Sequence, residues 1–241
     1  MYPELLNIYA DRGNIAVLRG RAQWRDIDLD VHAIVRGRPI PADTDLVYIG
    51  GGQDRDQLLI ADDIAGRQAE LGGFVESGGA LLAVCGGYQL LGRFYRDTSG
   101  RELPGAAVFP LSTEAGANRL IGDVLLETTF TDGEARTVAG FENHAGRTRL
   151  DPGVEPFGRV VHGFGNDGES GQEGCRRGAA IGTYLHGPLL PRNPWLADWL
   201  LERAIEHRTG SSRTLAELDD ELELAAHAVS SERARVRGGR H

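Results

Sequence analysis

The chain has 241 residues, of which 41% are hydrophobic and 25% charged, a composition typical of a soluble globular protein with one large core. The formal net charge of −9 argues against a nucleic-acid surface, because phosphate binding needs a local excess of Lys and Arg. The sequence contains no Lys, which excludes a P-loop nucleotide site and a Schiff-base lysine. If the reaction uses ATP, we therefore expect another polypeptide to bind it.

The cysteine content and the N-terminus indicate the compartment. Cys85 and Cys175 are the two cysteines, too few for a disulfide framework or a Cys-based zinc site, so we expect no metal. Residues 1–4 lack the basic-then-apolar order of a signal peptide. No apolar run approaches the ~20 residues that cross a bilayer. A cytoplasmic location is the expectation.

Strands alternate with helices in the first third of the chain. The spacing of apolar residues predicts, in order, a strand at 5–9, a helix at 14–25, strands at 28–35 and 45–49, a helix at 56–77 and a strand at 81–84. This order predicts an α/β fold with a doubly wound, mostly parallel sheet. Sites in such sheets lie beyond the carboxyl ends of the strands.

The remainder of the chain has a different pattern. Short β-prone segments separated by turns predict β-hairpins added to the sheet. A segment rich in Gly, Glu and Asn predicts a mobile surface loop in which Cys175 is incidental. These elements are, in order, hairpins within 105–162, a loop at 166–178, a last apolar strand at 179–184, an amphipathic helix at 194–208 and a further helix after Gly210. We expect one domain over 1–208 and a helical extension over 209–241, either a solvated terminal helix or a docking helix for a partner.

The stretch at 81–91 carries the strongest chemical signal. The apolar residues 81–84 end at Cys85, Gly86 and Gly87 follow, and residues 88–91 resume with helical spacing. A strand that turns at once into a helix, with a nucleophile at the corner, is a nucleophile elbow. We expect the glycines to permit the sharp turn and the helix N-terminus to favour the thiolate. A lone Cys at a strand end is more often an inert core residue, but the two glycines favour the nucleophile.

His186 is the best candidate for a proton carrier. It follows the predicted strand at 179–184, as Cys85 follows the strand at 81–84, and adjacent parallel strands bring such residues together. A structural His at a strand end is the alternative. His144 is the second candidate.

An oxyanion hole needs two backbone N–H groups aimed at one point. One is the N–H of the residue after the nucleophile, Gly86. The other is expected from the glycine-rich loop that follows the strand at 45–49, and within it we choose Gly52. Three glycines also form a flexible turn, but their place directly after a buried strand favours the donor role.

These segments resemble a known family. Residues 84–89 (Val-Cys-Gly-Gly-Tyr-Gln) are similar to the nucleophile motif Cys-x-Gly-x-Gln of class I, triad-type glutamine amidotransferases, and the doubled glycine resembles the cobyrinic acid synthase-like branch. Residues 183–187 resemble the family's catalytic-His motif, and residues 141–146 a block that lines the site. The resemblance extends from about residue 6 to 208. It implies a flavodoxin-like, three-layer αβα fold and hydrolysis of L-glutamine through a thioester on Cys85.

Within this family the chain resembles the glutaminase subunits of lipid II isoglutaminyl synthases. That likeness implies a heterodimer with a Mur-ligase-like, ATP-dependent synthetase that binds ATP and Mg and amidates the D-glutamate of the peptidoglycan precursor. It implies no cofactor on this chain. It also assigns Arg119 to the substrate, whose α-carboxylate suits an Arg fork. Gln89, one helical turn past Cys85, either faces the substrate or holds the elbow.

One position departs from the family pattern. Triad-type enzymes carry a Glu two residues after the catalytic His, and here that residue is Pro188. A carboxylate that orients the His is worth orders of magnitude in rate. We therefore expect the partner subunit to supply the acid.

Other interpretations remain open from the residues alone. The chain could serve an amidotransferase for cobyrinic acid or another acid substrate, although such enzymes often carry an ATP-binding domain that this chain has no room for. It could be a non-catalytic docking subunit with an inert Cys85. A Cys hydrolase of the same sheet architecture is a further alternative, and it would turn over esters or peptides without a partner.

Overall fold

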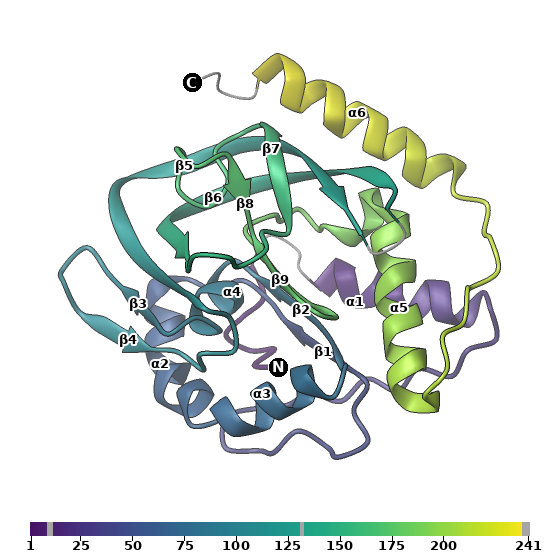
Figure 1. The fold of residues 1–241 in the computed structure, drawn as a ribbon, viewed down its shortest axis with the longest axis horizontal. Coiled ribbons are helices and arrows are strands. Elements are labelled where there is room, and N and C mark those ends of the chain that lie inside the picture. The colour runs from purple at the N-terminus through teal and green to yellow at the C-terminus, as the bar shows by residue number, and fades with distance from the viewer. Residues whose placement is uncertain (9–11, 131–132, 238–241) are drawn as a thin grey trace.

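Two sheets organise the chain (Figure 1) in the computed structural model, which describes residues 1–8, 12–130 and 133–237. The smaller sheet has the strand order β1-β2-β10-β9. β1, β2 and β10 are parallel, and β9 pairs antiparallel with β10 at the edge. The strands are β1 (Leu46–Ile49), β2 (Ala80–Val84), β10 (Ala180–Thr183) and β9 (Cys175–Arg177).

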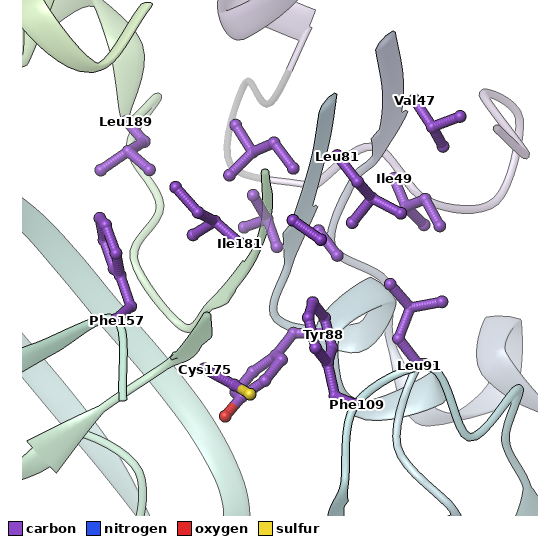
Figure 2. Packing of buried hydrophobic residues seen from close by; sticks show 14 of the residues in the cluster. Val47, Ile49, Leu81, Tyr88, Leu91, Phe109, Phe157, Cys175, Ile181 and Leu189 are labelled. Carbon is purple, nitrogen blue, oxygen red and sulfur yellow. The ribbon is translucent and has the colours of Figure 1, made fainter. Parts of the chain in front are cut away.

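The central strands of this sheet are apolar because both of their faces are covered. Every residue of β2 and β10 is buried, as expected for parallel strands between helices. Ile49, Leu81 and Ile181 of three adjacent strands pack into one cluster with Leu91 and Phe109 (Figure 2). The pairing of Val84 with Thr183 sets the carboxyl ends of β2 and β10 level with each other.

Helices cover the two faces of the parallel sheet. α5 contacts β1 and β2 and is joined by α1, while α2 and α3 lie on the opposite side (Figure 1). Their bounds are α1 (Arg12–Gln23), α2 (Asp54–Ala65), α3 (Gln68–Glu76) and α5 (Pro194–Thr209). The predicted α/β class with a largely parallel sheet between helices is confirmed.

The predicted β-hairpins form a sheet of their own. The strand order along this sheet is β4-β3-β5-β7-β8, and β6 pairs with β5 outside that order. The long hairpin of β5 and β6 is the largest part of the sheet. The pairing of β5 with β6 shifts register between Ala115 and Leu120. The strands are β3 (Phe94–Arg96), β4 (Glu102–Pro104), β5 (Leu111–Thr129), β6 (Ala135–Leu150), β7 (Gly158–His162) and β8 (Gln172–Glu173).

Two predicted strands are wrong near the N-terminus. Residues 5–8 form no strand, and Tyr9 lies outside the described residues. Residues 28–35 alternate correctly, yet they run as irregular chain with Val31 48% exposed. The amino group of Met1 instead donates to the carbonyl of Tyr48 on β1, at 2.5 Å. The Tyr2 N–H donates to the Ile34 carbonyl at 2.7 Å, but one backbone hydrogen bond does not make a strand, because a strand needs a ladder of them along a neighbour.

The single helix predicted over 56–77 is two helices. α2 ends at Ala65 with Gly66 as its C-cap, and Arg67 leaves helical geometry at φ −94°, ψ 12°. The Arg67 guanidinium turns inward there and donates to Asp63 Oδ2 at 3.0 Å and Glu70 Oε2 at 2.9 Å. The break between α2 and α3 therefore places the Arg67 guanidinium, paired with Asp63 and Glu70, in the interior.

The segment at 166–178 is ordered, contrary to the prediction of a mobile loop. It contains β8 and β9, and Cys175 is fully buried among core residues (Figure 2). The Asn166 side chain closes the turn, since its Nδ2 donates to Gly174 O and its Oδ1 accepts from Gly174 N, both at 2.9 Å. The glycines here serve defined turns rather than flexibility, since Gly168, Gly171, Gly174 and Gly178 all have positive φ, and Gly174 also packs closely against Gly182.

The C-terminal helix α6 (Glu221–Arg237) packs on β5 and β6 after an extended segment (Figure 1). Ala234 is fully buried against Leu125 and Ala139, and His227 lies 2.9 Å from Thr137 Oγ1. The helix begins later than the apolar spacing after Gly210 suggests. Among the described residues, no helix is long and apolar enough to cross a membrane.

Candidate active site

A cavity of about 670 Å³ lies at the carboxyl ends of β1 and β2, where the sheet architecture places sites. Residues that the sequence singled out line it together: Gly52, Cys85, Gln89, Arg119 and, as the second candidate base, His144. The rest of its described lining consists of Ile8, Gln53, Asp54, Arg55, Gln57, Tyr95, Asn143 and Ala145. Segments far apart in the sequence therefore share one concave surface.

Cys85 occupies the turn between β2 and the short helix α4 (Gly86–Leu90). Its backbone is strained, with φ 49° and ψ −107°, a conformation that costs a non-glycine residue on the order of 1–3 kcal/mol. The Cys85 N–H donates to Thr183 O at 2.7 Å, which fixes the turn to the end of β10. The residue is 5% exposed. A strained residue at a strand-to-helix turn, with its side chain in the lining of a cavity, matches the predicted nucleophile elbow.

The doubled glycine has a different purpose from the one predicted. Gly86 and Gly87 have ordinary helical backbone, and the left-handed residue is Cys85 itself. A Cβ on Gly87 would lie 2.8 Å from the carbonyl oxygen of Gly50, and a Cβ on Gly86 would lie 3.0 Å from the backbone nitrogen of Gly52. The glycines thus let α4 approach the loop after β1. This approach brings Gly86 close to Gly52, and the predicted oxyanion hole needs the N–H groups of both residues near one point.

His186 lies at the same edge of the sheet as Cys85. Thr183, whose carbonyl accepts from the Cys85 N–H, pairs with Val84 and precedes His186 by three residues. The backbone of His186 bridges to Phe141 of β6, with its N–H donating at 2.7 Å and its carbonyl accepting at 3.3 Å. The residue is fully buried, and it is not part of the described cavity lining.

His144 lines the cavity, but its ring is committed elsewhere. The imidazole stacks on Tyr184 with ring centroids 3.5 Å apart. Its Nδ1 lies 2.8 Å from Gly146 O and its Nε2 lies 3.5 Å from Glu142 Oε2. Burial lowers the pKa of His144, against the opposing effect of Glu142. Because both ring nitrogens face protein oxygens, His144 lines the site but is not placed to take a proton from a substrate.

Arg119 enters the cavity from the irregular part of the long hairpin. It precedes Leu120, where the β5–β6 pairing resumes after its register shift, and such bulges re-aim side chains near active sites. Asn143 holds the guanidinium, because Arg119 Nε donates to its Oδ1 at 2.7 Å and Nη2 to its carbonyl at 2.6 Å. The exposed side chain is thereby fixed in direction and keeps further N–H groups for a ligand.

A buried polar network beneath Cys85 was missed by the sequence reasoning. Gln57 Nε2 donates to Gln89 Oε1 at 3.0 Å, and Gln89 Nε2 donates to the Tyr184 hydroxyl at 3.2 Å. That hydroxyl lies 2.6 Å from Thr148 Oγ1. The Gln89 amide therefore ties α4 to α2 and to the residue after β10. Tyr184, two residues before His186, was the available signal.

Glu173 connects the two sheets. This fully buried side chain of β8 accepts from the Tyr184 N–H at 2.6 Å and lies 3.0 Å from Thr183 Oγ1, both at the end of β10. Burial raises the pKa of Glu173 to about 8. The carboxyl group is therefore neutral at mildly acidic pH. Across residues 1–8, 12–130 and 133–237, no three His, Cys, Asp or Glu side chains gather as a metal site.

Comparison with known proteins gives a consistent result. Residues 1–194 match the model of the CobB/CobQ-like glutamine amidotransferase domain. The chain is 42% identical to the lipid II isoglutaminyl synthase (glutamine-hydrolyzing) subunit GatD of Staphylococcus aureus, over 95% of this chain and 92% of that protein. It is 36% identical to the subunit of the same name from Streptococcus pneumoniae, over 92% of this chain and 85% of that protein.

The fold also matches a solved structure. PurLQS from Thermotoga maritima superposes with a TM-score of 0.51 at 17% sequence identity, over 87% of this chain and 95% of that chain. At this identity the likeness concerns the fold alone.

Proposed function

The chain belongs to the CobB/CobQ-like glutamine amidotransferase family, and from this premise we propose that it hydrolyses L-glutamine to glutamate and ammonia as a subunit of a lipid II isoglutaminyl synthase. The observation that carries the proposal is the strained Cys85 in a cavity that it shares with the fixed guanidinium of Arg119. The likeness to GatD subunits over nearly the whole chain supports the lipid-linked acceptor.

The first half of the reaction uses the elbow. The Cys85 thiolate attacks the side-chain amide carbon of glutamine, and the backbone N–H groups of Gly86 and Gly52 stabilise the oxyanion that forms. The carbon–nitrogen bond then breaks as the leaving nitrogen takes a proton, ammonia departs, and a thioester remains on the sulfur. His186 donates that proton.

The second half restores the enzyme. His186 now accepts a proton from water, which attacks the thioester carbon. Glutamate leaves and the Cys85 thiolate is regenerated. His186 suits this role better than His144, because its chain position at the end of β10 is level with Cys85 and the ring nitrogens of His144 face Gly146 and Glu142.

The carboxylate that completes the catalytic group comes, in this proposal, from the partner subunit. Pro188 stands where the family has its Glu, and it packs against Gly13 of α1, whose Cβ position lies 2.6 Å from Pro188 Cγ. The partner is a Mur-ligase-like synthetase in a cytoplasmic heterodimer. It binds ATP and Mg, activates the D-glutamate of lipid II, and receives the ammonia. Residues 1–208 form the amidotransferase domain, and 209–241 its extension.

A comparison of the isolated chain with the complex tests this function. We expect the complex to release glutamate from glutamine with a kcat at least about 10²-fold above that of the chain alone, as expected for a missing orienting acid. A diazoketone analogue of glutamine should alkylate the Cys85 sulfur with loss of N2, which adds the mass of the remaining ketone to the chain and abolishes the activity. Full glutaminase activity of the isolated chain would refute the role of the partner's acid, and hydrolysis of esters or peptides but not glutamine would refute the function.

A further inference from the structure

Asp54 and Tyr95 line the cavity of Cys85 but take no part in the steps above. We propose that the Asp54 carboxylate binds the α-ammonium group of glutamine and so selects an α-amino acid over other amides. This inference rests on the proposed glutaminase function and names the group that recognises one end of its substrate.

The charges of the cavity match a zwitterion. Glutamine brings a carboxylate and an ammonium group that lie together, away from the amide under attack. Arg119 supplies the fixed cation for the carboxylate. Asp54 is the only carboxylate within the described lining, and a charge-assisted hydrogen bond to a carboxylate favours an ammonium over a neutral group.

The other cation of the lining is directed elsewhere. The Arg55 guanidinium has Nε 3.6 Å from Asp56 Oδ1, and its side chain is 79% exposed. Arg55 therefore pairs with the neighbouring acid and leaves Asp54 available to a ligand.

Tyr95 gives the lining a rigid wall near Asp54. Tyr95 lies in β3, paired with Leu103 of β4 and Thr113 of β5, and is 1% exposed. Burial raises the pKa of Tyr95, and the charge of the Asp54 carboxylate adds to the effect. The phenol therefore stays neutral and does not neutralise Asp54. A carboxylate has several acceptor positions, which leaves Asp54 room for an ammonium.

The position of Asp54 along α2 suits the polar end of the substrate. Asp54 is the first residue of the helix and is exposed, whereas Cys85 is 5% exposed. One helical turn further, the buried Gln57 binds Gln89 of α4. α2 is therefore anchored to the helix that begins at Cys85, which fixes Asp54 relative to the sulfur. The amide of glutamine enters first and its charged end stays near the entrance.

Substrate analogues that lack one charge test the assignment in the complex with the synthetase subunit. Glutaramate lacks the α-ammonium, and 4-aminobutanamide lacks the α-carboxylate. We expect Asp54→Asn to raise the KM for glutamine about 10–100-fold, the loss typical of one charge-assisted hydrogen bond. The inhibition constant of glutaramate should remain within about 3-fold of wild type, while that of 4-aminobutanamide should rise as the KM does. Inhibition constants are measurable whether or not the analogues are hydrolysed.

Asp62→Asn is the matched control, because it removes a charge from an exposed position of the same helix without touching the cavity lining or the partner of Arg55. It should leave all three constants unchanged. Alkylation of Cys85 by iodoacetamide, which carries neither charge, should proceed at the wild-type rate in both variants and reports an intact elbow. Equal weakening of glutamine and glutaramate by Asp54→Asn, or no weakening of either, would overturn the assignment. A wild-type complex that does not hydrolyse glutamine would instead refute the function itself.

Discussion

The parallel sheet and the β5–β6 hairpin contribute to one cavity in different ways. The sheet places Cys85 in the cavity at the end of β2, and His186, which follows β10 at the same edge, lies outside the described lining. In the proposed mechanism these two residues supply the reactive groups. The hairpin provides Arg119, Asn143 and His144 from the middle of two long strands, around a register shift. A strand end positions a residue by chain connectivity alone, whereas a mid-strand residue depends on its pairing partner. Chemistry and recognition are therefore separable by mutation.

The two cysteines give the largest expected contrast. Cys85→Ala should lower glutamine hydrolysis by the complex at least about 10⁴-fold, because the nucleophile is removed. Cys175→Ala should leave the rate within a few-fold and cost about 1 kcal/mol of unfolding free energy, because it only opens a small gap in the core. Burial raises the pKa of Cys175 to about 12, so its thiol is unreactive at neutral pH. Turnover and urea unfolding measure the two effects, and comparable loss of turnover in both variants would contradict the elbow.

The two histidines provide the next test of the division between sheet and hairpin. His186→Gln should reduce kcat about 10²–10⁴-fold, the usual contribution of a general acid–base group. His144→Gln should act mainly on KM and on stability, since its ring contacts Tyr184, Gly146 and Glu142. Steady-state kinetics of the complex distinguish them. If His144→Gln removed most of kcat while His186→Gln kept it, the assignment of the base would be reversed.

Arg119→Lys isolates the contribution of the hairpin to binding. A Lys cannot reproduce the planar fork that Asn143 orients, so the KM for glutamine should rise about 10–100-fold with kcat changed only a few-fold. Arg96→Lys on β3 is a control, because Arg96 pairs with Glu102 and Glu114 and does not line the cavity. A loss confined to kcat would show that Arg119 acts on the chemistry instead.

The smallest expected effect concerns Glu173, the buried residue that connects the two sheets. The pKa of Glu173 is raised from 4.5 to about 8 in the folded state, so the folded state favours the neutral acid. The resulting stabilisation is complete below about pH 4.5 and is lost as the pH rises through about 8. Glu173→Gln mimics the neutral acid. Relative to wild type, the variant should gain on the order of 3 kcal/mol of unfolding free energy between pH 5 and pH 8.

Urea unfolding at both pH values measures this difference. Wild-type protein at the same pH is the reference for each measurement. A difference between variant and wild type that does not change with pH would mean that Glu173 is ionised throughout the range.

The sequence alone predicted the class of the fold and the strand ends at which the proposed catalytic residues lie. Runs such as β2 and β10 are apolar throughout because both of their faces are buried, and Cys85 and His186 follow directly from where those runs end. The family resemblance added Arg119. The alternation at 28–35 predicted a strand that does not form. A strand also needs a neighbouring strand to pair with, and the residues of the stretch itself do not show whether one is present.

Only the tertiary structure decided which residues surround the sulfur. The pairing around Arg119, the stacking of His144 on Tyr184 and the shared lining of Asp54 and Tyr95 all join segments far apart in the chain. The doubled glycine was visible in the sequence, yet its purpose became clear only where α4 meets Gly50 and Gly52. Local patterns report burial and turns, because these act on neighbouring residues. Contacts across the cavity depend on how two sheets pack, which no single stretch of sequence records.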